Sequence, residues 1–187
     1  TDDSGIPKIA TNIMARASMI PSILKNPVVY YQYDLQEDDT PEIVAHKYYG
    51  TSYRYWIVLF ANQLLDPQWD WPLSSKVFYR YVQSKYPDIE TTSEIHHYEK
   101  IRTQYDYNTQ TETVDVITID EETYNSLVES SNEYELNTGL VRVDITKRPV
   151  SIYDYELAIN DSKKTISILN KKYVDQMEME FQQLMAV

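Results

Sequence analysis

The run Tyr55–Ala61, read as YWIVLFA, constrains the fold of this chain more than any other segment. It lies inside a predicted helix at residues 52–64, and a helix that is apolar on nearly every face must be covered on nearly every side. Two strands and two helices could not cover such a helix alone. Further protein, from the rest of the chain or from a partner, must pack around it. We therefore expect Trp56, Leu59 and Phe60 to be core residues.

A strand and a well-marked helix precede this run. The β-branched and aromatic residues at 28–35 predict a strand. Thr40 is a suitable N-cap, and Pro41 suits the first helical position. Gly50 can adopt the left-handed conformation that ends a helix. We therefore predict a helix at 41–49.

The rest of the chain alternates between strand and helix patterns. The predicted elements are a short strand at 69–73, a helix at 74–85, strands at 95–107 and 114–119, a helix from 121 to about 130, a strand at 140–145, a helix at 152–159, a strand at 164–169 and a terminal helix. The pattern predicts an α+β fold with three parts. These are an N-terminal arm at 1–27, a βααβ module at 28–86, and a C-terminal region of strands and helices at 87–187 that ends in an amphipathic helix.

Two apolar segments are candidates for binding other subunits. The arm carries Ile9 and Ile13, but its prolines prevent a long helix, so it must lie on other protein. The terminal helix carries an apolar stripe at helical spacing. The stripe contains Tyr173, Met177, Phe181 and Leu184. For both segments, packing on the chain itself is the alternative to packing on a neighbour.

Charge and composition exclude several classes of function. A formal net charge of −12 disfavours nucleic acids, because Lys and Arg supply affinity for phosphate. No apolar run is long enough to span a membrane, and the absence of cysteine excludes disulfides and thiolate metal sites. The 18 tyrosines favour an assembly component, because tyrosine suits half-buried interfaces. Packing within tyrosine-rich strands explains them equally well.

No pattern indicates catalysis or a cofactor. Three glycines are too few to build the nucleotide-binding loops. The nearest approach to a metal-ligand cluster is the set Glu94, His96, His97 and Glu99. Adjacent histidines on a strand face opposite sides, which disfavours a shared ion. The acidic residues at 120–122 are not by themselves a catalytic pair. We therefore predict no enzymatic activity, no metal and no cofactor.

The order of motifs in residues 28–86 resembles a LysM domain. The motifs are Tyr31, Tyr33, the turn Asp38-Asp39-Thr40, Ile43-Val44-Ala45, Tyr48-Tyr49-Gly50, Trp56, Leu59, Asn62, Leu64 and Pro67. Trp71, Tyr79 and Lys85-Tyr86 extend the pattern. With the strand at 164–169 and the Met-rich terminal helix, the whole resembles the LysM-containing baseplate wedge protein of contractile-tailed bacteriophages.

The resemblance implies a non-catalytic subunit of the virion, located in the tail baseplate and made in the host cytoplasm. It would join wedge proteins to each other and around the central hub during tail assembly, with other wedge and tail proteins as partners. The alternative is a LysM protein that binds peptidoglycan. Its glycan groove would contain Asp38, Asp39, Thr40, Asn62 and Asp66. Glu37 stands where a glycine is usual in carbohydrate-binding LysM domains, which weakens this alternative.

Overall fold

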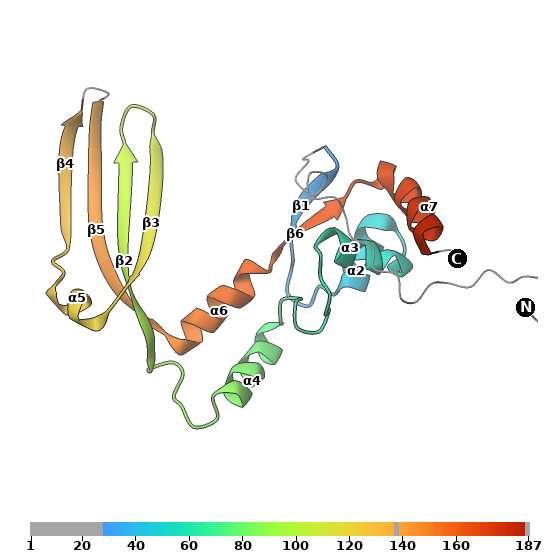
Figure 1. Ribbon diagram of the computed structural model, residues 1–187, viewed down its shortest axis with the longest axis horizontal. Helices are drawn as coiled ribbons and strands as arrows, with labels where there is room; N and C mark the ends of the chain where they lie inside the picture. Colours follow the sequence, from blue (N-terminus) through green and yellow to red (C-terminus); the bar gives the residue numbers. More distant parts are fainter. Residues whose placement is uncertain (1–27, 137–138, 186–187) are drawn as a thin grey trace, which may run out of the picture. The chain divides into compact units, whose positions relative to one another are not determined.

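The computed structural model describes residues 28–136 and 139–185, and its mixture of helices and strands confirms the predicted α+β class (Figure 1). The chain forms two compact units. The first contains the described residues up to Ser75 and those from Asp161 onward, and the second is Lys76–Asn160. This division differs from the expected boundaries at 27 and 86. The expected arm at 1–27 lies outside the described residues.

The first unit is built from both ends of the described chain. Its elements are β1 (Tyr30–Asp34), α2 (Pro41–Tyr49), the 3₁₀ turn η1 (Ser52–Arg54), α3 (Tyr55–Ala61), β6 (Thr165–Leu169), the 3₁₀ turn η2 (Lys171–Tyr173) and α7 (Val174–Met185). β1 pairs antiparallel with β6, from Tyr30 opposite Leu169 to Asp34 opposite Thr165. The predicted strand at 69–73 is wrong, because this segment consists of turns and loop, and β6 supplies the partner of β1.

The predicted limits of α2 are confirmed. The Thr40 hydroxyl accepts a hydrogen bond from the Ile43 N–H at 3.3 Å and so caps the first turn. Gly50 ends the helix at φ 79°, a conformation that costs glycine little. The second predicted helix is shorter than expected, because η1 leads into α3 and α3 ends at Ala61.

The core of the first unit surrounds α3. Val58 belongs to a cluster on one side of this helix, and Ile57 and Ala61 belong to a cluster on the other. The first cluster contains Leu35, Val44, Ala45, Val58, Trp71, Ile166 and Ile168, and the second contains Tyr30, Ile57, Ala61, Leu169 and Val174. Trp56, Leu59 and Phe60 are only half-buried, so the expected core triplet lies at the rim. The covering that an apolar helix requires comes partly from the end of the chain.

The second unit contains a four-stranded antiparallel sheet. Its elements are α4 (Ser75–Lys85), β2 (Ile95–Asp106), β3 (Thr111–Ile119), α5 (Glu121–Ser126), β4 (Ser130–Leu136), β5 (Gly139–Ser151) and α6 (Ile152–Ser162). The strand order is β3-β2-β5-β4. β4 was not predicted, and β5 is longer than the predicted strand at 140–145. Figure 1 shows the four strands side by side with α5 at one end.

The sheet itself is only partly covered within its own unit, and β3 is its most exposed strand. Among the sheet residues whose burial the structure describes, only Val141 and Val150 are buried. At one end, the Tyr124 ring of α5 lies 4.5 Å from the Tyr98 ring of β2. The Lys147 Nζ donates to the Tyr124 carbonyl there, at 2.6 Å. Within its own unit, the sheet therefore resembles a single layer rather than one of the two packed sheets of a sandwich.

Two helices of the second unit are joined by a buried carboxylate. Glu156 of α6 is 4% exposed in its side chain and lies 2.8 Å from the Lys85 Nζ of α4. The Tyr86 hydroxyl donates to the same oxygen at 2.8 Å. These bonds compensate for burial of the charge, and the Phe78 ring packs on Tyr153 nearby. The contacts give Glu156 a structural role.

Candidate functional site

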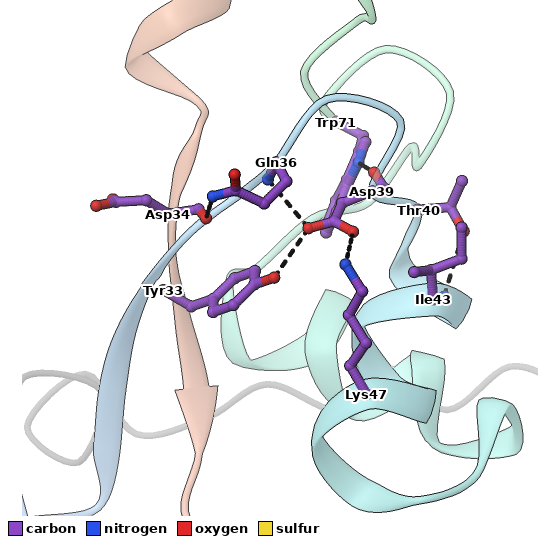
Figure 2. Close-up of polar contacts among 8 residues, drawn as sticks. All are labelled: Tyr33, Asp34, Gln36, Asp39, Thr40, Ile43, Lys47 and Trp71. Atoms are coloured by element: carbon purple, nitrogen blue, oxygen red, sulfur yellow. Dashed lines mark hydrogen bonds and ion pairs between the residues drawn. The ribbon is translucent and has the colours of Figure 1, made fainter.

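The loop between β1 and α2 was expected to border a glycan groove, and Asp39 forms its centre (Figure 2). The Asp39 side chain is 3% exposed. It accepts hydrogen bonds from the Tyr33 hydroxyl at 2.9 Å, the Gln36 backbone N–H at 3.0 Å and the Lys47 Nζ at 2.5 Å. The carboxylate therefore joins the strand, the turn and the first helix of the unit.

The electrostatics of this cluster keep Asp39 ionised. Burial by itself would raise the pKa of the Asp39 carboxyl, but the hydrogen bonds from Lys47, Gln36 and Tyr33 outweigh it and lower the pKa below its usual value. The hydrogen bond to Asp39 raises the pKa of Lys47 in turn. Near neutral pH the cluster is an ion pair that also holds Tyr33 in its hydroxyl form.

Two further contacts hold the loop to Trp71 and to the first residue of α4. The Trp71 Nε1–H donates to the Asp39 carbonyl at 2.8 Å, as Figure 2 shows. The Glu37 carboxylate accepts from the Ser75 backbone N–H at 2.7 Å. Asp38 is exposed and has a positive φ of 65°, which aspartate tolerates in turns. The loop is thus fixed by its own side chains, with Asp38 facing solvent.

The other candidate groove residues also serve local structure. Asn62 clamps α3 to β6: its Nδ2 donates to the Ser167 carbonyl and its Oδ1 accepts from the Ser167 N–H, both at 2.8 Å. Asp66 accepts from the Gln68 N–H at 3.0 Å within a turn. Thr40 is the helix cap. The polar groups that would have contacted a sugar are therefore engaged within the chain at four of the five positions.

The stripe on α7 is divided between its own unit and solvent. Tyr173 and Met177 pack against the core cluster that contains Ile57. The Phe181 ring lies 4.8 Å from the Trp56 ring, beside an open pocket of about 330 Å³ that these two side chains help to line. Leu184 is 67% exposed. The other two partner-binding candidates, Ile9 and Ile13, lie outside the described residues.

The division of the stripe predicts unequal effects of substitution. Phe181→Ala should lower the free energy of unfolding by about 2 kcal/mol, because it removes a half-buried ring from Trp56 and Phe60. Leu184→Ala should change it by less than about 0.5 kcal/mol. Urea denaturation of both variants measures the difference. Equal losses would contradict the described packing of α7.

The histidine pair lies differently from the expectation. The register of β2 against β5 is interrupted between Ile95 and His97, and this irregularity brings His96 and His97 together. Their Nδ1 atoms lie 2.8 Å apart, and the His96 ring stacks on Tyr155 at 3.8 Å. The expectation that the rings face opposite sides was wrong. No group of three potential metal ligands occurs among the described residues.

Sequence reasoning missed the exposed edge of the large sheet. Residues 111–118 of β3 are all exposed, and Val114, Val116 and Ile117 are at least half-exposed. The signal was present, because apolar β-branched side chains occur on both faces of this strand. A strand with one buried face would alternate polar and apolar residues instead. The edge is a candidate surface for contact with another protein.

Comparison with protein families gives a match over most of the chain. A family model described as "Base plate wedge protein 53" matches residues 11–184, which include the whole second unit and nearly all described residues of the first. A search of curated proteins gave no match to the chain. In the part of the chain that the structure describes, no helix has the length and apolar character that crossing a membrane requires.

Proposed function

Since the chain belongs to the phage base plate wedge protein 53 family, we propose that it joins wedge proteins to one another and around the central hub during assembly of a contractile tail. The proposal rests mainly on the family match across residues 11–184. Membership implies a structural role in the virion baseplate and contact with other baseplate proteins. We add to this the proposal that the joined partners are the wedge proteins and the proteins around the central hub.

The first unit supports the LysM resemblance in a modified form. It contains a strand, two helices and an antiparallel second strand, in the order β1, α2, α3 and β6. Residues 76–160 then form an insertion before the second strand. We infer that the LysM-like module has been recruited as a scaffold that carries the inserted sheet.

The charged groups support a non-catalytic role. Among the described residues, the buried carboxylates are Asp39 and Glu156, and each is paired with a lysine. A general acid or base must be able to reach a substrate, and these groups are committed to holding elements together. Adhesion through buried interfaces needs no such group.

The terminal helix supports adhesion through its exposed side. Tyr173, Met177 and Phe181 anchor α7 to the first unit. Met179 and Leu184 are 58% and 67% exposed, so they are available to a neighbouring subunit. Ile9 and Ile13, from the N-terminal residues 1–27, remain proposed contacts of the same kind. Nothing in the loop contacts favours the glycan alternative.

The test is a phage in which translation of this gene is stopped by a nonsense mutation. We expect infected cells to accumulate baseplate precursors without complete tails, and supplying the protein in trans should restore them. Titration of the purified protein with soluble peptidoglycan fragments should show no saturable binding. Complete tails in the mutant would overturn the proposal, and saturable binding of the peptidoglycan fragments would favour the glycan alternative.

A further inference from the structure

β3 is a long edge strand. It lies at one end of the strand order β3-β2-β5-β4 and pairs with β2 alone. All nine residues are in continuous register, from Thr111 opposite Asp106 to Ile119 opposite Tyr98. The side of β3 that faces away from β2 therefore presents backbone N–H and C=O groups in a regular row. Such a row is a template for another strand.

Apart from the acidic residues Glu112 and Asp115, β3 lacks the features that protect natural sheet edges. Its sequence contains no proline, glycine or lysine. Its pairing with β2 shows no shift of register, whereas the register of β2 against β5 shifts between Ile95 and His97. Natural proteins use such residues, bulges or very short strands to prevent unwanted pairing. An edge of this length with so few protecting features indicates a strand that is covered in the assembled baseplate.

The side chains of β3 favour strand addition on both faces. Val114 and Val116 lie on one face of the sheet and Ile117 lies on the other, because alternate residues face opposite sides. Their exposed fractions are 52%, 50% and 56%. An added strand would cover these side chains with cross-strand neighbours as well as pairing the backbone.

Charge indicates the kind of partner. β3 carries Glu112 and Asp115 and no basic residue, although Arg102 of β2 lies 3.4 Å from the Asp115 carboxylate. Antiparallel pairing of two copies about the middle of β3 would bring Asp115 opposite itself, where like charges repel. The net charge of −12 also opposes self-association. A strand from another protein that carries lysine or arginine would have complementary charge.

We propose that β3 receives an extended basic segment of another baseplate protein as a fifth strand of the sheet. This mode of recognition combines backbone hydrogen bonds, which supply affinity, with side-chain contacts that select the partner. The inference rests on the proposed function, because it takes the occupant to be a neighbouring subunit of the baseplate.

The absence of cysteine from the chain permits a direct test by site-specific crosslinking. Single cysteines replace Thr113, Asp115 or Ile117 on one face, or Val114 or Val116 on the other. Each variant is assembled into baseplates after attachment of a short photoreactive crosslinker, and the linked peptides are identified by mass spectrometry. Leu65→Cys, at a residue 94% exposed in the first unit, is the matched control.

We expect the β3 variants to link to one segment of another protein that contains lysine or arginine. A shift of two residues along β3 should shift the linked position by about two, as strand pairing requires. The control should not link to that segment. Reversal of the charge at Glu112, by E112K, should lower the yield of crosslinked product several-fold, and it leaves the pairing of Asp115 with Arg102 in place.

Four results would overturn the inference while leaving the proposed function intact. The first three are links to a second copy of this chain, links scattered without register, and an unchanged yield of crosslinked product in E112K. Absence of links from a subunit that is present in the baseplates would also overturn it. Absence of the unmodified subunit from baseplates would instead reject the proposed function.

Discussion

Deletion of residues 165–187 should leave residues 28–75 unfolded, although the deleted segment lies far away in the sequence. The deletion removes β6, the strand that pairs with β1. It also removes four core side chains that are at most 4% exposed, Ile166, Ile168, Leu169 and Val174. Each costs about 2–5 kcal/mol to truncate, and a whole domain is stable by only about 5–15 kcal/mol. The remaining elements cannot offset that loss.

The matched control for this deletion retains β6 and α7 and replaces residues 76–160 with a flexible glycine-serine linker. The first unit should then fold, because both of its core clusters lie within the residues that remain. Dispersion of amide signals in NMR spectra reports folding of the unit in each variant. Native dispersion for residues 28–75 after the deletion would contradict the described core.

Asp39→Asn should destabilise the first unit by about 3 kcal/mol at neutral pH. The substitution removes the charge that pairs with Lys47 and places amide hydrogens where Tyr33 and Gln36 already donate. Loss of hydrogen bonds to a buried charge costs about 1.5–3 kcal/mol each, although such terms do not add fully. The control is Asp38→Asn, because this exposed neighbour has a positive φ that asparagine also tolerates. We expect a change below about 0.5 kcal/mol there.

The effect of Asp39→Asn should depend on pH in a defined direction. The folded pKa of Asp39 lies below its ordinary value of 3.8, so the stability that ionisation contributes is present in full above about pH 4. It is lost as the pH falls through the folded pKa. Denaturation curves should therefore show a difference between wild type and Asp39→Asn that narrows below pH 4. A difference that is constant across this range would exclude the ionised carboxylate as its cause.

Local sequence signals correctly predicted those elements whose ends are determined by residues close to them in the chain. Thr40 and Gly50 determine the ends of α2 through their own hydrogen bonds and backbone conformation. The strand at 69–73 was predicted wrongly because Trp71 and its neighbours are apolar enough for a strand. Trp71 instead packs as a buried residue of the first core cluster, and its Nε1–H donates a hydrogen bond to the Asp39 carbonyl. The pairing of β1 with β6 depends on contacts across more than a hundred residues, which local patterns do not contain.

The second unit also contains features that local sequence patterns could not predict. β4 has the sequence SSNEYEL, whose polar residues resemble a loop, and its pairing with β5 makes it a strand. Pairing with a neighbour can override weak strand propensity. The β2 irregularity that brings His96 and His97 together has no glycine to mark it in the sequence. A prediction from residue alternation alone therefore placed these rings on opposite faces.

The sequence predicted where the candidate site lies better than it predicted what each of its residues does. The sequence placed Asp38, Asp39 and Thr40 in one loop, and the structure agrees. It could not show that Asp39 points inward to Lys47, since an inward and an outward aspartate look alike in a sequence. For α7, helical spacing identified the stripe. It did not separate Phe181, which packs on Trp56, from Leu184, which remains exposed.

Quantitative mass spectrometry of purified baseplates tests the assignment to the baseplate wedge most directly. Tails are purified by sedimentation and dissociated, and this chain is measured relative to the other wedge proteins. The account predicts a fixed whole-number ratio to those proteins, which persists through repeated purification and in high salt. A chain that is absent from the baseplates, or present in traces that washing removes, would contradict the account.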